Sequence, residues 1–577
     1  MFQLATAAQM KELDRRAIEE RGIPSLELME NAARAVAGTV WELLYPAEEG
    51  FSPVLSSVSS MIVMRKKDDP PPTDEEQRQA EELREIIERK NTDPTPRVAV
   101  FCGPGNNGGD GVACARLLME KGGCHVRAFF VGDRAQMTPD ETAMEDKLTA
   151  AGGRLEDFTI DLTDRETAEA TMDYEQQKIL TWLSTCDVMV DALFGIGLTR
   201  PVEGVFRTAV TQMQSRVNCP VVACDVPSGV NADTGEVLGE AVQAKVTVTF
   251  TRPKPGLYSG PGAGRAGEVR IVDIGIPHDL EYQMFRALPR LEVMHQPDSQ
   301  LPLRPRNAHK GDFGKIFILA GSEGYTGAPV LAARAALRIG AGLVYLGVPR
   351  DIYPIVAVKC DEAMPFPLPE DYSAILERAS SCDAALIGPG LGRSPEAEQL
   401  VLSLLADLEI PAVLDADGIN ALAEHIDVLD RRTAPTVLTP HEGEFSRLTG
   451  CALPIRDRLS AARNFAGDHG CILVLKGHGT VTAAPDGSAC INATGNPGMA
   501  KGGSGDVLAG MIAGLLGQKH LRRESRDNTP ELVQAAVCLH GLTGDQCAKK
   551  FGEYAMLPTD LIETLPEILR RWTEEES

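Results

Sequence analysis

Apolar and polar positions follow two rhythms along this chain, and each rhythm predicts a different element. Near the start, Met10, Leu13 and Ala17 recur at helical spacing behind Thr6 and Gln9, a pair typical of a capped helix start. Short apolar runs between such amphipathic stretches predict strands. In the first half these strands are 97–103, 126–131, 187–192, 220–226, 244–250 and 269–274. In the second half they are 315–320, 343–348, 384–387, 412–415, 436–438, 472–475 and 480–483. Strands that alternate with helices predict an α/β fold in each half.

Polar or glycine-rich turns follow three of the predicted strands in the first half. They occupy 106–111, 191–201 and 225–229. The order of strand, glycine-rich turn and helix is typical of a doubly wound sheet, in which ligands bind at the carboxyl ends of strands. We therefore expect the three turns to line one pocket.

The second half carries five further turns, at 321–328, 388–392, 415–420, 439–444 and 476–480. They are followed by a glycine-rich stretch, Gly495–Gly510, that leads into an apolar helix. Such a turn directs unpaired N–H groups and the positive end of the helix dipole at one point, which suits a phosphate. Asp506, in the first turn of that helix, is either a helix cap or a base that faces the same ligand.

The length and the local composition predict two domains joined by a linker. The 577 residues exceed a single core. The stretch 278–305 is rich in proline and leucine, and we interpret it as a linker between residues 1–277 and 306–577. Within the first domain, 51–96 is interpreted as an insertion in which a charged, solvated helix lies between Pro-rich segments.

Charge and cysteine content narrow the class of protein. The net charge of -25 argues against nucleic acid or an anionic membrane as a main partner. The 13 cysteines contain no C-x-x-C pair, which favours free thiols in a reducing cytosol over a zinc ribbon or a disulfide framework. The first residues lack the features of a signal peptide, and no apolar run approaches the roughly 18 residues of a membrane span. We expect a cytoplasmic, globular protein.

Three motifs in the second half carry a resemblance to a known family. They are Thr-Pro-His-Glu-Gly-Glu at 439–444, Lys-Gly-His-Gly-Thr at 476–480 and Gly-Asn-Pro-Gly-Met-Ala-Lys-Gly-Gly-Ser-Gly-Asp at 495–506. Over about residues 300–570 the chain resembles the ADP-dependent NAD(P)H-hydrate dehydratases, which have a ribokinase-like α/β/α fold. The resemblance implies that the nucleotide is held by Lys476, Gly477, His478, Gly479, Thr480 and Gly505. It also implies that hydrated nicotinamide is bound by Ala328, Gly390, Gly392, His441 and Asp506.

The first half resembles the NAD(P)H-hydrate epimerase family, which has a Rossmann-like sheet. The resemblance rests on Asn-Asn-Gly-Gly-Asp-Gly at 106–111, on 192–204, where Ile196 replaces an expected threonine, and on Asp-Val-Pro-Ser-Gly at 225–229. It implies that the dinucleotide is contacted by Asn106, Asn107, Gly108, Gly109, Asp110, Gly195, Ile196, Gly197, Leu198, Thr199, Arg200, Pro201 and Asp225. It also implies a potassium ion near Asn107, Asp191 and Ser228, whose hard oxygen donors suit an alkali ion better than zinc.

Together the two halves resemble the bifunctional enzymes that repair hydrated NADH and NADPH, which tend to form homo-oligomers. The resemblance implies that the R and S forms are interconverted and that the S form is dehydrated at the expense of ADP, giving AMP and phosphate. Asp506 is expected to take the hydroxyl proton, and magnesium is expected at the phosphoryl transfer. Either Asp191 or Asp225 is expected to give acid–base help in the epimerase, and the sequence does not choose between them.

Several alternatives stay open at this stage. The second half could be a small-alcohol kinase with the same anion hole, fused to a non-catalytic binding domain. His441 could be a core histidine, and Asp415 and Asp417 are interpreted as turn-formers rather than bases. Lys501 could face the nucleotide or the solvent.

Overall fold

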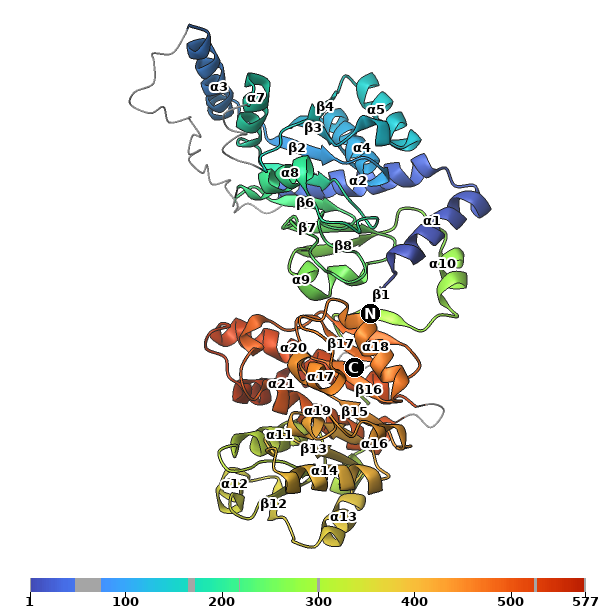
Figure 1. Ribbon diagram of the computed structural model, residues 1–577, viewed down its shortest axis with the longest axis vertical. Coiled ribbons are helices and arrows are strands. Elements are labelled where there is room, and N and C mark those ends of the chain that lie inside the picture. The colour runs from blue at the N-terminus through green and yellow to red at the C-terminus, as the bar shows by residue number, and fades with distance from the viewer. Residues whose placement is uncertain are drawn as a thin grey trace. The chain divides into compact units, whose positions relative to one another are not determined.

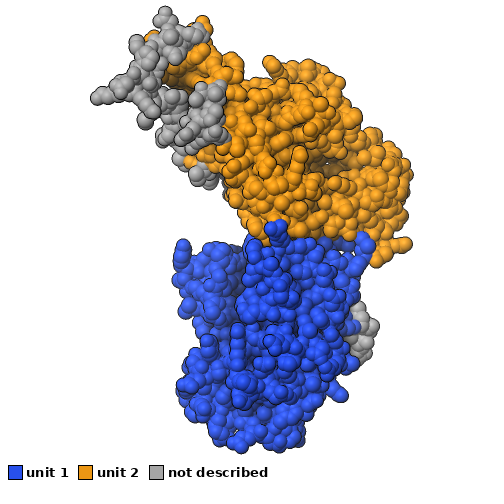
Figure 2. Space-filling model, in the orientation of Figure 1, with its two compact units in different colours: residues 1–3, 288–577 blue, residues 4–287 orange. Residues whose placement is uncertain are grey.

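The computed structural model describes residues 2–46, 74–163, 172–216, 218–297, 301–302, 304–522 and 527–574. The chain divides into two compact units, shown in different colours in Figure 2. The N-terminal unit is formed by residues 4–287, and the C-terminal unit by residues 1–3 together with 288–577. Helices and strands alternate through both units (Figure 1), which confirms the predicted two-domain α/β architecture.

The N-terminal unit contains a seven-stranded parallel sheet with the strand order β4-β3-β2-β5-β6-β7-β8. The strands are β2 (Arg97–Cys102), β3 (His125–Val131), β4 (Leu155–Phe158), β5 (Val188–Ala192), β6 (Val221–Cys224), β7 (Val246–Phe250) and β8 (Glu268–Val272). Six of them match the predicted strands. β4 has no counterpart among the predictions, because acidic residues stand between its two apolar ends.

Helices cover both faces of this sheet. They are α1 (Ala7–Arg21), α2 (Ser25–Leu44), α3 (Asp74–Thr92), α4 (Asn106–Lys121), α5 (Pro139–Ala150), α7 (Tyr174–Leu183), α8 (Gly204–Gln214), α9 (Gly260–Ala263) and α10 (His278–Phe285). On β2, Val98 and Val100 belong to a core with α1, α2 and α4, whereas Ala99 and Phe101 belong to a core with α7 and α8. Both faces of each central strand are therefore buried, as in a doubly wound sheet. The predicted capping box forms at the start of α1, where Thr6 and Gln9 bond each other's main chain.

Two segments interpreted from composition contain regular elements. The insertion at 51–96 includes α3, whereas its Pro-rich first part lies outside the described residues. The stretch 278–305, interpreted as a linker, contains α10 and a strand, β9 (Leu291–Met294). β9 lies between β1 (Phe2–Gln3) and β18 (Ala489–Asn492) in the sheet of the C-terminal unit.

The C-terminal unit contains an 11-stranded sheet with the order β1-β9-β18-β17-β16-β15-β14-β13-β10-β11-β12. Its other strands are β10 (Lys315–Leu319), β11 (Leu343–Val348), β12 (Met364–Pro367), β13 (Ala384–Ile387), β14 (Ala412–Leu414), β15 (Thr436–Leu438), β16 (Ile472–Leu475) and β17 (Thr480–Ala483). The strands from β12 to β16 pair in parallel, and β16, β17 and β18 pair antiparallel. The seven predicted strands are present. The four that were not predicted (β1, β9, β12 and β18) lie toward the ends of the sheet, where short strands leave little pattern.

The helices of this unit are α11 (Gly327–Arg338), α12 (Tyr353–Lys359), α13 (Tyr372–Ser380), α14 (Pro395–Asp407), α15 (Asp417–Asn420), α16 (Asp427–Asp430), α17 (Glu442–Thr449), α18 (Arg458–Asp468), α19 (Ser504–Gly517), α20 (Thr529–Phe551) and α21 (Pro558–Glu574). Short 3₁₀ helices occur in both units at η1 (Arg134–Gln136), η2 (Pro255–Leu257), η3 (Lys310–Phe313), η4 (Pro497–Met499) and η5 (Lys519–Leu521). None of the described helices is both long and apolar enough to cross a membrane.

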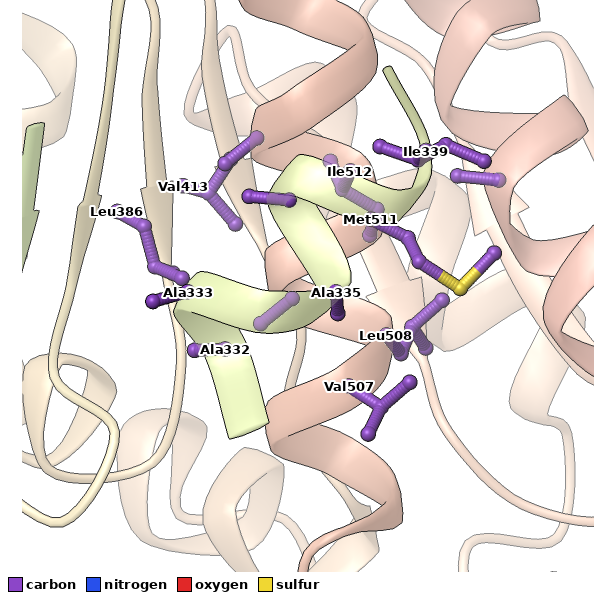
Figure 3. Close-up of a cluster of buried hydrophobic side chains, with 14 of the residues drawn as sticks. Ala332, Ala333, Ala335, Ile339, Leu386, Val413, Val507, Leu508, Met511 and Ile512 are labelled. Carbon is purple, nitrogen blue, oxygen red and sulfur yellow. The ribbon is translucent and has the colours of Figure 1, made fainter. Parts of the chain in front are cut away.

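The apolar helix α19 is held at the centre of the C-terminal core. Alanines of α11 face larger side chains of α19 there, with Leu386 of β13 beside them (Figure 3). A Cβ atom added to Gly510 would lie 2.2 Å from the main-chain oxygen of Ala332, so α11 and α19 approach as closely as their backbones allow. This contact fixes the position of α19, and hence of the glycine-rich turn that opens it.

Candidate active sites

The predicted turns of the C-terminal unit meet at one edge of the sheet. β13, β14, β15 and β16 are parallel neighbours, so the turns after them lie side by side. The main-chain N–H of Thr439 donates to Leu414 O at 3.0 Å, and that of Lys476 donates to Pro440 O at 2.8 Å. The N–H of Gly321 donates to Pro389 O at 2.9 Å and ties in the turn after β10.

Asp415, interpreted from the sequence as a turn-former, is a buried partner of Lys476. Its Oδ1 accepts hydrogen bonds from Lys476 Nζ and from Thr439 Oγ1, each at 2.7 Å. The Asp415 side chain is 2% exposed. Burial lowers the pKa of Lys476, but the carboxylates of Asp415 and Glu444 favour the charged ammonium, and together they raise its pKa above the ordinary value. Lys476 therefore stays a cation at the centre of the site.

Asp506 lies in the first turn of α19, next to this pair. Burial, with the nearby Asp415 carboxylate, raises its pKa to about 7, and Lys476 acts in the opposite direction. A Cβ atom added to the neighbouring Gly505 would lie 3.3 Å from Lys476 Nζ, so the turn lies against the lysine. The residue at the N-cap of α19 is Gly503, without a side-chain cap, so Asp506 does not cap this helix. A carboxyl that titrates near neutral pH is suited to general base catalysis.

Three of the residues predicted to bind the hydrated ring, Ala328, Gly390 and Gly392, lie at the start of α11 and on the turn that contacts it. A Cβ atom added to Gly390 would lie 3.1 Å from that of Ala328. Ser322 Oγ donates to Gly390 O at 2.8 Å, and Gly392 N donates to Asp417 Oδ2 at 2.9 Å. Asp417 therefore holds the turn at 388–392, in line with its interpretation from the sequence as a turn-former rather than a base.

His441 is not a core histidine. Its side chain is 55% exposed, and its Nδ1 accepts from the N–H groups of Gly443 and Glu444 at the start of α17. An isolated β-bridge pairs His441 with Lys476. In the neutral ring the proton is then on Nε2, which lies 3.4 Å from Glu444 Oε1.

The predicted nucleotide turn, 476–480, is held by its own side chain and by a residue that the motifs did not indicate. Thr480 Oγ1 donates to Gly477 O at 3.0 Å. The guanidinium of Arg458, at the start of α18, donates to the carbonyls of His478 and Gly479. Arg458 lies between Arg456 and Arg463 in the sequence, and no pattern distinguishes it from them or signals its contact with the turn.

Two other residues near the glycine-rich turn have contacts that the sequence did not indicate. Lys501 is half-buried, and its Nζ donates to Tyr554 O at 2.7 Å and to Met556 O at 2.6 Å. His540, on α20, lies close to the main chain of Ser504, and burial lowers its pKa to about 4. His540 is therefore a neutral side chain behind the turn.

In the N-terminal unit, Asp191 and Ser228 form a buried pair. Asp191 Oδ1 accepts from Ser228 Oγ at 2.6 Å, and its Oδ2 accepts from Ser228 N at 2.7 Å. Burial raises the pKa of Asp191 to about 6, against these hydrogen bonds, which lower it. Phe194 N donates to Ser228 Oγ at 2.9 Å, which links the second turn to the third.

Asn107 lies against the second turn. A Cβ atom added to Gly195 would lie 3.2 Å from Asn107 Oδ1, and Asn107 Nδ2 is buried without a hydrogen-bond partner among the described residues. Beyond Gly195 the chain returns toward solvent: Leu198 is buried in the core, whereas Gly197, Thr199, Arg200 and Pro201 are exposed and Ile196 is half-buried. The structure thus brings Asn107, Asp191 and Ser228 to adjoining strand ends.

The start of α4, which carries the predicted contacts 106–110, has an acidic neighbour that the sequence did not indicate. Glu141 is fully buried, and its Oε2 accepts from Gly105 N at 2.9 Å. Its Oε1 would lie 2.6 Å from a Cβ atom added to Gly108. Burial raises the pKa of Glu141 to about 7. Asn106 is exposed, whereas Gly108 and Gly109 are buried against the neighbouring elements.

Asp225 has a buried lysine as its partner. Lys254, which is 1% exposed, donates from Nζ to Asp225 Oδ1 at 2.5 Å, and Thr249 Oγ1 donates to the same oxygen at 3.1 Å. The backbone of Asp225 has φ 65, a conformation that a non-glycine residue adopts at a cost and that often marks a functional position. Lys254 lies outside the recognised motifs.

Two more aspartates belong to this cluster. Asp110 is buried, and burial raises its pKa well above the ordinary value, with Asp225 and Asp14 acting in the same direction. Burial also raises the pKa of Asp14, on α1, to about 6, against the effect of Lys254. The cluster therefore combines three carboxyl groups with one lysine, and Asp14 could not be identified from α1 alone.

Comparisons with known proteins match both units. The family model described as NAD(P)H-hydrate dehydratase matches residues 316–567, and the model described as YjeF-related protein N-terminus matches residues 25–256. The bifunctional NAD(P)H-hydrate repair enzyme of Moorella thermoacetica is 38% identical over 99% of this chain and 97% of that protein. The enzyme with the same name from Thermofilum pendens is 40% identical over 83% of this chain and 88% of its own. Among solved structures, the ADP/ATP-dependent NAD(P)H-hydrate dehydratase of Bacillus subtilis, co-crystallised with ATP and Mg²⁺, is 33% identical over 47% of this chain and 95% of that chain, with a TM-score of 0.41.

Proposed function

Because this chain belongs to the family of bifunctional NAD(P)H-hydrate repair enzymes, we propose that it restores hydrated NADH and NADPH. The N-terminal unit interconverts the R and S forms of the hydrate, and the C-terminal unit dehydrates the S form with ADP as co-substrate. The observation that carries the proposal is Asp506, a carboxyl with a pKa of about 7 beside the Lys476 cation, at the mouth of a glycine-rich turn. A kinase of small alcohols is the weaker alternative, because the named repair enzymes match the chain over both units.

The dehydration begins with activation of a poor leaving group. Asp506 takes the proton of the ring hydroxyl, and the oxygen attacks the terminal phosphorus of ADP, so that AMP leaves. The phosphorylated oxygen then departs as inorganic phosphate while the adjacent ring carbon loses a proton, which restores the dihydropyridine. The amides of 502–505 and the Lys476 ammonium stabilise the charge on the transferred group. Magnesium accompanies the phosphates of ADP, as hard cations do in such transfers.

Asp415 supports this chemistry without meeting the substrate. Its carboxylate holds Lys476 at 2.7 Å and raises the pKa of Asp506 by its charge. The same group therefore fixes the cation that faces the phosphate and keeps the base matched to neutral pH.

In the N-terminal unit, the two candidate aspartates have different parts. Asp191 is fully buried and both of its oxygens accept hydrogen bonds, so it organises the site, whereas Asp225 faces the substrate with the oxygen that Lys254 does not hold. The residues that would hold potassium are Asn107, Asp191 and Ser228, which offer amide, carboxylate and hydroxyl oxygens. When bound, the ion supplies positive charge near the dinucleotide.

The test is recovery of NADH from a mixture of both hydrate epimers, followed by its near-ultraviolet absorbance. Wild type with ADP recovers all of the NADH, whereas Asp506→Asn recovers none. Asp225→Asn recovers about half at early times, before spontaneous epimerisation supplies the rest. Asn107→Ala, assayed in potassium and in sodium, loses the difference between the two salts. No NADH from wild type would refute the proposal and bring the kinase alternative forward.

A further inference from the structure

Arg458 lies under the turn at 476–480 and contacts it from inside the protein. Its side chain is 4% exposed. Nη1 donates to His478 O at 2.6 Å and to Gly479 O at 3.1 Å, and Nη2 donates to Leu475 O at 3.0 Å. One buried guanidinium thus holds three carbonyls at the end of β16 and in the turn that follows it.

These hydrogen bonds determine which way the N–H groups of the turn face. In a trans peptide unit the C=O and the N–H point in opposite directions. Because the carbonyl of His478 points at Arg458, the N–H of Gly479 points to the opposite side of the turn. Among the described residues this N–H has no hydrogen-bond partner. It is therefore an oriented donor available to an anion.

The guanidinium also contributes charge. Arginine stays protonated in proteins. Among the described residues Arg458 forms an ion pair with Glu442, whose Oε1 lies 3.0 Å from Nε and whose side chain is 35% exposed. A Cβ atom added to Gly477 would lie 2.6 Å from Nη2, so the glycine lets the cation approach the turn. A buried positive charge beneath the turn adds to the potential that an anion meets above it.

We infer that Arg458 is a positioning residue that shapes the turn at 476–480 for the phosphates of the nucleotide. The inference rests on the proposed function, which assigns this turn to ADP. Through Glu442, which follows His441 in the chain, Arg458 also joins the nucleotide turn to the turn assigned to the hydrated ring. The β-bridge between His441 and Lys476 joins the same two turns independently. Order in one turn is thereby coupled to order in the other.

The experiment measures ADP binding to the full-length chain by calorimetry, together with KM for ADP and kcat. Arg458→Met removes the three hydrogen bonds and the charge. Arg458→Lys keeps the charge but lacks the several N–H donors of the guanidinium. The matched control is Arg463→Met. Arg463 lies on the same helix, and its Nε donates to Gly487 O at 2.7 Å, in the turn between β17 and β18.

Arg458→Met is expected to weaken ADP binding and raise KM for ADP by about tenfold to a hundredfold, the range for losing hydrogen bonds to a charged group. Arg458→Lys is expected between Arg458→Met and wild type, and Arg463→Met is expected to bind ADP as wild type does. If Arg458 only stabilised the fold, Arg458→Met and Arg463→Met would lower the melting temperature equally and would leave the KM for ADP unchanged.

A folded Arg458→Met protein with wild-type affinity for ADP would overturn the inference while leaving the proposed function intact. Should Arg458→Met not fold, Arg458→Lys decides, because unchanged ADP affinity in that variant overturns the inference in the same way. Failure of wild type to bind ADP would instead overturn the proposed function.

Discussion

Replacing Asp415 by asparagine tests the electrostatic account of the dehydratase base. Asparagine keeps the size of the side chain and an oxygen that can accept from Thr439, but it removes the negative charge. Two consequences act in the same direction. The charge that raises the pKa of Asp506 is lost, and Lys476 loses its 2.7 Å partner and becomes available to the Asp506 carboxylate. Both favour ionised Asp506, so its pKa falls.

The size of the change follows from the causes of the shift. Asp506 has a pKa of about 7 against an ordinary value of 3.8, and burial is the largest cause, so most of the shift remains in the variant. Loss of one neighbouring charge changes a pKa by about one unit, which is about 1.4 kcal/mol. At pH 6 the ionised fraction of Asp506 then rises from about a tenth to about a half, so the variant retains about fivefold more of its maximal rate than wild type does.

The assay is kcat/KM for dehydration of the S hydrate with ADP, measured from pH 5 to pH 9. Because the base must be ionised, the rate rises with pH through the pKa of Asp506. The midpoint is expected near pH 7 in wild type and near pH 6 in Asp415→Asn. The control is Asp417→Asn, which removes a carboxylate from the same turn, one that accepts a hydrogen bond from Gly392 N. This variant should keep the wild-type midpoint. A midpoint that stays at pH 7 or rises in Asp415→Asn would refute the assigned charges.

Three further predictions concern stability and the N-terminal site. Lys254→Met leaves the buried Asp225 carboxylate without its ammonium, so unfolding by urea should show a loss of about 3–5 kcal/mol, and Lys254→Arg should restore part of it. Glu141→Gln should raise the melting temperature at pH 8 but not at pH 4. The pKa of Glu141 in the folded protein, about 7, lies above its ordinary value, so ionisation of Glu141 destabilises wild type as the pH rises. An equal gain in melting temperature at both pH values would contradict this. Gly510→Ala should lower the free energy of unfolding by at least about 1–3 kcal/mol, because its Cβ would lie 2.2 Å from a main-chain oxygen of α11, and an unchanged value would mean that the two helices can separate.

The sequence predicts the architecture well because the central strands are buried on both faces. Residues 384–387, 436–438, 472–475 and 480–483 are strands at the predicted boundaries. Elements at the margins of the sheets follow other rules. In β12 prolines interrupt the apolar run, and β9 is a short strand inside a proline-rich stretch whose partner, β18, comes almost two hundred residues later. Such strands depend on pairing rather than on local pattern.

The residues of the candidate sites also fall into two groups, those with a local sequence pattern and those without one. Turn residues that meet a ligand have local signatures, since glycines and polar groups must follow strand ends in a set order. Their partners have none. Lys254 is brought to Asp225 by the order of β6 and β7, and Arg458 reaches the nucleotide turn from a helix that precedes it. No property of Lys254 or Arg458 in the sequence differs from that of a solvated side chain.

The partners missed by the sequence share one physical task. In each unit an aspartate at a strand end bonds a lysine through Oδ1: Asp415, interpreted from the sequence as a turn-former, bonds Lys476, and Asp225 bonds Lys254, which lies outside the motifs. A buried ion pair contributes little stability compared with an apolar pair of the same volume. Its use lies in holding a charge at a fixed place, and in each case the charge stands next to residues that carry the proposed chemistry. Arg458 does the same for a main-chain turn. The sites therefore depend on charges placed beneath the motifs, and substitutions there should alter pH dependence and ligand affinity as well as stability.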